Sequence, residues 1–293
     1  MSYAPEVRSF HFVPFGSQAD GDAVCCDGLV PGAGLHLSHW EGNETPPHLK
    51  ADTSTEIALR CARDGSVSRP VVNNHFDADG ALSVWALLDP DTALAHQDLI
   101  VAAAEAGDFD EWPSNERGLW LEAAITKLAQ TASDDAAAYR LVLAELPSLV
   151  ANLETRRELW EEQWQRLQSD EVRAAELAVA RIGDIAVFHH RRIAELAGPV
   201  LSKRAPQGVK RWLLAFEDDG GRFRYRYELP RYAWADTVAR PLIDKPDADT
   251  LVSGLGKTWT TDAPGMTGLA ATSSPIDIEP GLIAERLREI DEP

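Results

Sequence analysis

Residues 71–88, VVNNHFDADGALSVWALL, predict a strand, a polar loop and a helix in that order. The stretch opens with β-branched valines, passes through a run of polar residues and ends in an apolar helical segment. In open α/β sheets this arrangement places ligands at the loop, outside the carboxyl end of the strand. The loop contains His75, Asp77 and Asp79, and these side chains suit a hard or borderline divalent cation. The stretch therefore predicts an α/β fold with a candidate metal site.

Two other interpretations of this loop compete with the metal site. The His75-x-Asp77-x-Asp79 spacing is similar to that of a calcium-binding EF-hand loop, in which His75 and Ala86 would stand at positions 1 and 12. Calcium needs oxygen ligands at both positions, so that interpretation fails. An Asp- and Asn-rich turn with nothing bound remains open, because such turns are common between strands and helices.

The segment NNHFDADGALS, residues 73–83, resembles motif I of the DHH phosphoesterase superfamily. That superfamily includes RecJ-like nucleases, oligoribonucleases, exopolyphosphatases and type II pyrophosphatases. The resemblance implies that Asp77 and Asp79 bind Mn²⁺ or Mg²⁺, and that His75 is a ligand or a general acid. His75 falls where RecJ-like members carry another acidic residue, and Asn73 falls where other members carry a histidine.

The composition indicates a globular protein whose acidity fits a small anionic substrate better than long duplex nucleic acid. The chain has 293 residues, of which 44% are hydrophobic, and a net charge of −19. That charge opposes binding to duplex nucleic acid or to anionic lipid, and no apolar run is long enough to cross a membrane. Three cysteines form neither a disulfide framework nor a zinc spacing, and no signal peptide is recognised, so we expect a cytoplasmic protein.

The residues before the central stretch predict a strand–helix–strand unit. Strands are expected at 8–15 and 34–40, and a helix begins near residue 52, with Thr53 and Glu56 spaced as a capping box. In a βαβ unit the strands at 34–40 and 71 would be parallel neighbours. His39 would then lie at the sheet edge that carries His75, Asp77 and Asp79. We expect His39 to be a further metal ligand, with a structural role as the alternative.

Helices are expected from residue 91 to residue 180. The first runs over 91–106 and stops at Gly107, which is followed by Asp108. In order along the chain, Asp108 resembles the second ligating aspartate of the DHH superfamily, although that aspartate ends a strand. Apolar residues at helical spacing predict three further helices, and Ser169 is expected to cap another that ends near residue 180.

A short strand over 185–188 is expected to end at His189 and His190. The pair resembles the Asp-His-His motif that names the superfamily, but Phe188 stands where the aspartate would be. The alternative is that the two residues are charged interface histidines. The sequence leaves the role of the pair open.

The segments 211–216 and 222–228, joined by Glu-Asp-Asp-Gly-Gly, predict a β-hairpin. Arg222, Arg224 and Arg226 would project from one face, as suits recognition of a phosphate or a carboxylate. The hairpin belongs to a locally basic region, since residues 181–231 contain 11 Lys and Arg against 6 Asp and Glu. A solvated hairpin face is the alternative.

Together these patterns predict an α/β protein with a parallel-sheet N-terminal domain (1–115), a helical connector or insert (116–180) and a smaller α+β C-terminal domain (181–293). The expected function is Mn²⁺- or Mg²⁺-dependent hydrolysis of a small phosphoester or phosphoanhydride. His75 and Asp79 are the expected catalytic residues. The expected metal ligands are His39, His75, Asp77, Asp79 and Asp108, and the expected substrate contacts are Arg222, Arg224 and Arg226. A non-catalytic ligand-binding module with a degenerate DHH-like site is the alternative.

Overall fold

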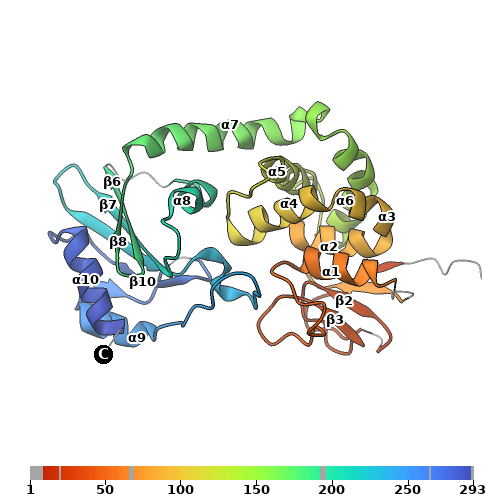
Figure 1. Cartoon of the computed structure of the whole chain (residues 1–293), viewed down its shortest axis with the longest axis horizontal. Helices are drawn as coiled ribbons and strands as arrows, with labels where there is room; N and C mark the ends of the chain where they lie inside the picture. Colours follow the sequence, from red (N-terminus) through yellow and green to blue (C-terminus); the bar gives the residue numbers. More distant parts are fainter. Residues whose placement is uncertain (1–8, 20, 66–68, 192–195, 264, 292–293) are drawn as a thin grey trace, which may run out of the picture. The chain divides into compact units, whose positions relative to one another are not determined.

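The chain folds into two compact units in a computed structural model that describes residues 9–19, 21–65, 69–191, 196–263 and 265–291 (Figure 1). The first unit comprises residues 1–166 and 235–240, and the second comprises residues 167–234 and 241–293. The chain therefore passes between the units three times. These units divide the chain differently from the three ranges predicted from the sequence, in which residues 116–180 form a connector.

The first unit contains a four-stranded parallel sheet in the order β1-β4-β2-β3. The strands are β1 (Phe10–Phe12), β2 (Val24–Cys26), β3 (Leu35–Leu37) and β4 (Val71–Asn73). Arg8, the first residue of the predicted N-terminal strand, lies outside the described residues. The prediction that β3 and β4 are neighbours was wrong, because β2 lies between them and pairs with both. Strand β2 is only three residues long and wholly buried, so it lacks the alternation that identifies a half-exposed strand.

Within the described residues of the first unit, seven α-helices pack on this sheet or on one another. They are α1 (Ser54–Arg63), α2 (Ala78–Leu88), α3 (Pro90–Ala95), α4 (Gln97–Phe109), α5 (Arg117–Ala129), α6 (Asp135–Ala151) and the first part of α7 (Arg157–Arg173). A 3₁₀ turn, Leu153–Thr155, precedes α7. The predicted cap of α1 is confirmed, since the Thr53 hydroxyl accepts a hydrogen bond from the Glu56 backbone N–H at 3.2 Å.

The single helix predicted over 91–106 is in fact two, α3 and α4, separated at His96. Gly107 does not end the second of them. A glycine ends a helix when it takes up the left-handed conformation, and here Asp110 adopts that conformation, at φ 49°. Helix α4 therefore continues to Phe109 and carries Asp108 in its last turn.

Helix α2 is the centre of the first unit's core. Every residue from Ala78 to Leu87 is buried, so the helix is covered on all sides rather than along one face. Trp85 packs in a cluster with residues of the sheet and of helices α1, α4, α5 and α6, among them Ile57, Ile100, Leu121 and Tyr139. This packing holds the N-terminus of α2 against the carboxyl edge of the sheet.

The second unit contains a six-stranded mixed sheet in the order β5-β6-β7-β8-β10-β9. Its strands are β5 (Ala178–Ile182), β6 (Ile185–Arg191), β7 (Arg211–Glu217), β8 (Phe223–Glu228), β9 (Trp259–Thr260) and β10 (Gly268–Thr272). Only β6 and β7 pair in parallel among these described strands. The helices are α8 (Gly198–Arg204), α9 (Ala248–Leu255), α10 (Pro280–Asp291) and a 3₁₀ turn, Arg231–Trp234.

The β7–β8 pairing confirms the predicted hairpin. The helix predicted from Ser169 to about residue 180 was wrong, because α7 continues to Arg173 and β5 begins at Ala178. The alanines of β5 favour a helix, but pairing with β6 overrides that preference. The predicted fold class is confirmed: a parallel N-terminal sheet with helices, a helical middle and a C-terminal mixed-sheet domain. None of the helices in the described ranges is both long and apolar enough to span a membrane.

Candidate metal centre

Four aspartates and two histidines come together at the carboxyl edge of the parallel sheet. Asp27 follows β2, His39 lies two residues beyond β3, and the loop after β4 carries His75, Asp77 and, in the first turn of α2, Asp79. Asp108 joins them from the last turn of α4. The topology produces this convergence, because parallel strands all end at the same edge.

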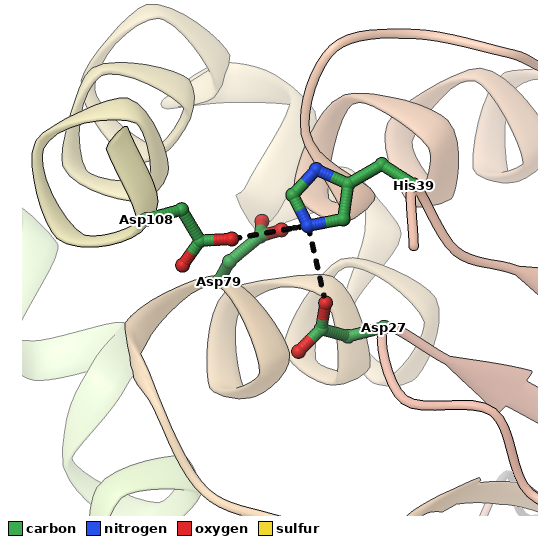
Figure 2. Close-up of side chains that lie close together, drawn as sticks. All are labelled: Asp27, His39, Asp79 and Asp108. Atoms are coloured by element: carbon green, nitrogen blue, oxygen red, sulfur yellow. Dashed lines mark ion pairs between the residues drawn. The ribbon is translucent and has the colours of Figure 1, made fainter. Parts of the chain in front are cut away.

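His39 faces three carboxylates with one ring nitrogen (Figure 2). Its Nε2 lies 3.1 Å from Asp108 Oδ2, 3.5 Å from Asp27 Oδ1 and 3.6 Å from Asp79 Oδ2. The other nitrogen, Nδ1, lies 2.7 Å from the backbone carbonyl of Asp52. A carbonyl only accepts hydrogen bonds, so Nδ1 carries a proton and Nε2 is the atom directed at the carboxylates.

A second group of side chains shares Asp27 with the first. His75 Nε2 lies 2.9 Å from Asp27 Oδ2 and 3.0 Å from Asp77 Oδ2. Within each group, the candidate ligand atoms all lie within 4.8 Å of one another, which is close enough for one ion. Oδ1 of Asp27 faces His39 and Oδ2 faces His75, so this carboxylate belongs to both groups.

Helix N-termini hold two of the carboxylates in place. The backbone N–H groups of Ser54 and Thr55, at the start of α1, each donate to one oxygen of Asp79 at 2.7 Å. The Ser54 hydroxyl donates to Asp27 Oδ1 at 3.0 Å. Asp77 caps α2 by accepting a hydrogen bond from the Gly80 N–H at 2.7 Å. The N–H groups at a helix N-terminus have no partner within the helix, so these carboxylates supply acceptors for them.

The Asn73 side chain joins the loop after β2 to the loop after β4 by hydrogen bonds. Its Oδ1 accepts hydrogen bonds from the backbone N–H groups of Gly28 and Asn74, and its Nδ2 donates to the Tyr139 hydroxyl at 2.7 Å. This network lies against Gly80 so closely that a Cβ there would be 2.7 Å from both Asn73 Nδ2 and Tyr139 Oη. Glycine is therefore required for the loops to approach the helix as they do.

The centre carries an excess of buried negative charge. With all four carboxylates ionised and both histidines protonated, the formal charge of the centre is −2. The side chains of Asp27, His39 and Asp79 are fully buried, and that of Asp108 is 7% exposed. Burying uncompensated charge is costly, and a bound cation is the usual compensation.

The pKa values follow from this crowding. Burial lowers the pKa of His39, but the hydrogen bond with Asp108 and the charge of Asp79 outweigh it and raise the pKa to about 10. Burial also lowers the pKa of His75, and hydrogen bonds with Asp27 and Asp77 raise it to about 11. For Asp79, burial and the charge of Asp27 raise the pKa to about 6. The histidines thus act as cations among the carboxylates, and a metal ion that binds there must displace their protons.

The structure brings together the five metal-centre residues predicted from the sequence, His39, His75, Asp77, Asp79 and Asp108. Sequence reasoning missed Asp27, which touches both groups. The available signal was weak: Asp27-Gly28 follows a three-residue strand that contains two cysteines. Asp27 is also one of two non-glycine residues with positive φ, 62°, in the described part of the chain, and a sequence does not reveal this.

The predicted substrate residues lie in the second unit. Arg224 is exposed on β8, and the guanidinium of the half-buried Arg226 lies 5.4 Å from the centroid of the Phe216 ring. Arg222, just before β8, is exposed and pairs with Asp218 at 3.2 Å. Their role as substrate contacts stays a prediction.

His189 and His190 also lie in the second unit, on β6. His189 Nε2 is 2.7 Å from Glu217 Oε2, and the His190 ring stacks on Phe216. Burial and the charge of His189 lower the pKa of His190 to about 4. Among the described residues, neither histidine belongs to a group of three or more side chains able to hold a metal.

Comparison with known proteins places the chain in a family. No protein in the curated set matches its sequence. Among solved structures, a pGpG-specific phosphodiesterase, PggH from Vibrio cholerae, is similar with a TM-score of 0.41 and 10% identity, over 92% of this chain and 83% of that one. The model of a family of unknown function, DUF6687, matches residues 8–273. Because this match spans most of the sequence, the chain belongs to the DUF6687 family.

Proposed function

We propose that the protein is a phosphoesterase that uses Mn²⁺ or Mg²⁺ to hydrolyse a small phosphoester or phosphoanhydride. The observation that carries the proposal is the pair of ligand groups that share Asp27, with a net charge of −2 at the edge of the sheet. Two-metal sites of this kind are typical of enzymes that cleave phosphate esters. The motif at residues 73–83, which resembles motif I of the DHH superfamily, supplies three of the six side chains.

The two groups differ in burial, and this difference supports different roles. His39, Asp79, Asp108 and one oxygen of Asp27 would hold the inner ion, since their side chains are almost fully buried. The outer ion would be held by His75, Asp77 and the other oxygen of Asp27. The side chains of His75 and Asp77 are 24% and 40% exposed, so substrate and water have access to the outer group.

Bound Mn²⁺ or Mg²⁺ would supply a water of lowered pKa and neutralise charge on the phosphoryl oxygens. The protein's own part is to fix the ligands. Asp79 is oriented by two backbone N–H groups, and Nδ1 of His39 is fixed by a backbone carbonyl. His75 is the side chain placed to act as a ligand or to pass a proton to the leaving group.

The alternative is a non-catalytic binding module, in which some of the expected metal ligands would lie too far away to reach the same ion. It would be favoured if His39 and Asp108 lay far from Asp79. His39 Nε2 lies 3.6 Å from Asp79 and 3.1 Å from Asp108, so all the expected ligands can reach one region. This geometry supports the enzyme over the module. The net charge of −19 supports a small anionic substrate rather than duplex nucleic acid.

The test is a hydrolysis screen of the protein after removal of bound metals. We expect release of phosphate or nucleotide from at least one small phosphoester, dinucleotide or polyphosphate when Mn²⁺ or Mg²⁺ is added, and none in EDTA. Asp108→Asn should lose most of this rate. Asp110→Asn is the matched control, because Asn tolerates the left-handed conformation of Asp110 and this residue is not a candidate ligand. No metal-dependent hydrolysis in the unaltered protein, or equal rates in Asp108→Asn, would refute the proposal.

A further inference from the structure

Residues 235–240, Ala-Asp-Thr-Val-Ala-Arg, form an inserted segment. The chain on both sides of these six residues belongs to the second unit, but the segment itself belongs to the first. It carries none of the candidate metal ligands. Its hydrogen bonds nevertheless go to the backbone of His39 and to residues next to the candidate ligands.

The first half of the inserted segment fixes the backbone at His39. An antiparallel β-bridge joins Ala235 to Trp40, and the Asp236 N–H donates to the His39 carbonyl at 2.6 Å. The Asp236 carboxylate in turn accepts hydrogen bonds from Lys50 Nζ at 2.5 Å and from Asn43 Nδ2 at 3.1 Å. The loop that carries His39 is therefore held from the side of the inserted segment.

The second half of the segment fixes Asp52, whose carbonyl accepts the hydrogen bond from His39 Nδ1. Oδ1 of Asp52 accepts hydrogen bonds from the backbone N–H groups of Val238 at 2.6 Å and Ala239 at 2.8 Å. Oδ2 accepts one from Arg240 Nη1 at 2.5 Å. Asp52 is 4% exposed, so the residue that orients the imidazole is buried and bound by three donors of the inserted segment.

Arg240 also reaches the end of α4, which carries Asp108. Its guanidinium binds Glu111 in a two-pronged arrangement, Nε to Oε1 at 3.2 Å and Nη2 to Oε2 at 2.6 Å. Nη2 also donates to Glu105 Oε1 at 3.1 Å. The guanidinium carbon lies 4.5 Å from the centroid of the Phe109 ring, which lies 5.7 Å from the His39 ring.

We infer that Arg240 is a positioning residue of the candidate metal centre, because it fixes the place of Asp108 relative to His39. One guanidinium binds Asp52, behind His39, and also Glu105 and Glu111, on either side of Asp108 in the sequence. A planar guanidinium can bind all three carboxylates at once, and a lysine ammonium cannot reproduce that geometry. The inference rests on the proposed function, in that these side chains are taken to bind a metal ion.

The experiment compares Arg240→Lys with Arg156→Lys in the full chain. Arg156 is a matched control: it also joins two glutamates of the first unit, Glu158 at 2.8 Å and Glu145 at 3.2 Å, and neither is a candidate ligand. Mn²⁺ affinity is measured by calorimetry. Changes to residues that orient metal ligands weaken affinity about 10- to 100-fold, so we expect at least about a tenfold loss in Arg240→Lys. The control should stay within about twofold, since surface pairs contribute little.

A second measurement separates positioning from general destabilisation. The proton on His39 Nδ1 is observed by NMR in EDTA, and it should exchange with water faster in Arg240→Lys than in the control. Glu111→Gln provides a milder variant in case Arg240→Lys fails to fold, because it weakens only the contact with the end of α4. Glu111→Gln should also weaken Mn²⁺ binding, and it should change the exchange rate of the His39 Nδ1 proton less than Arg240→Lys does.

The possible outcomes distinguish this inference from the proposed function. Mn²⁺ binding without hydrolysis in the unaltered protein would refute the phosphoesterase, and a tenfold weaker Mn²⁺ affinity in Arg240→Lys alone would then still support the role of Arg240. Hydrolysis together with unchanged Mn²⁺ affinity and unchanged His39 exchange in Arg240→Lys would overturn the inference alone. No Mn²⁺ binding in the unaltered protein would overturn both.

Discussion

Replacing Asp27 by Asn should remove most of the stabilisation that Mn²⁺ gives to the fold. Asp27 is fully buried and directs one oxygen to each ligand group. Asparagine has nearly the same shape, but it has no charge and only one of its two terminal atoms can bind a metal. A single substitution therefore weakens both candidate ion positions.

The magnitude follows from mass action. A ligand present at 100 times its dissociation constant stabilises the native state by about 2.7 kcal/mol for one site. In a unit of this size, about 1 kcal/mol shifts the melting temperature by roughly 2–4 °C. Mn²⁺ should therefore raise the melting temperature of the unaltered protein by about 5–11 °C for the first ion alone. In Asp27→Asn the rise should fall to less than half of that value, because the centre loses one of its four negative charges.

Differential scanning fluorimetry in EDTA and over a Mn²⁺ series measures the rise directly. The variant Asp91→Asn is the control, because Asp91 is exposed on α3 and belongs to neither ligand group. The rise is compared within each protein, so any effect of the substitution on the metal-free fold cancels. An Asp27→Asn protein that shows the same Mn²⁺-dependent rise as the control would refute the bridging role.

Three further predictions test other parts of the structure. The pKa values of the two site histidines, about 10 and 11, lie above the ordinary 6.5, so both bind protons at neutral pH and must release them to bind metal. Calorimetric titrations at pH 6, 7 and 8 should therefore show Mn²⁺ affinity rising with pH, by up to about tenfold per unit for each proton displaced. Gly80→Ala should lower the melting temperature in EDTA, since overpacking costs about 1–3 kcal/mol. Gly107→Ala is the control and should leave the melting temperature unchanged, because a Cβ there meets nothing closer than 3.4 Å. Equal melting temperatures of the two variants would contradict the close approach at Gly80. Removing the charges of Arg222, Arg224 and Arg226 together should raise KM more than it lowers kcat on a substrate found in the hydrolysis screen, and an unchanged KM would favour the solvated hairpin face.

Rules of local sequence and topology were enough to find most of the candidate centre. The β-branched start, polar loop and apolar helix of residues 71–88 predicted β4, its loop and α2, and these elements are present. The rule that parallel strands end at one edge then placed His39 beside Asp79, although the strand order used for it was wrong. The predicted position of His39 is nevertheless correct, because any two parallel strands of a sheet end at the same edge, whether or not they are neighbours.

The features that the sequence did not reveal depend on contacts between distant residues. Strand β2 is recognisable as a strand only through its pairing with β3 and β4, and without it Asp27 has no defined place. No proline or glycine marks the break at His96, and α4 continues through Gly107 although glycine has a low helix propensity. The inserted segment contains no metal-binding pattern, and its importance appears only when Arg240 is seen to bind Asp52, Glu105 and Glu111.

The three crossings of the chain between its units bear on the order of folding. Arg240 and Asp52 are separated by 188 residues along the chain, and closing so long a loop carries an entropic cost before any contact compensates for it. During synthesis, strands β1 to β4 and helices α1, α2 and α4 all leave the ribosome before this segment does. The surroundings of His39 and Asp108 can therefore be completed only after residue 240 has been added, and any structure that forms around α2 before then lacks the six residues that complete the candidate metal centre.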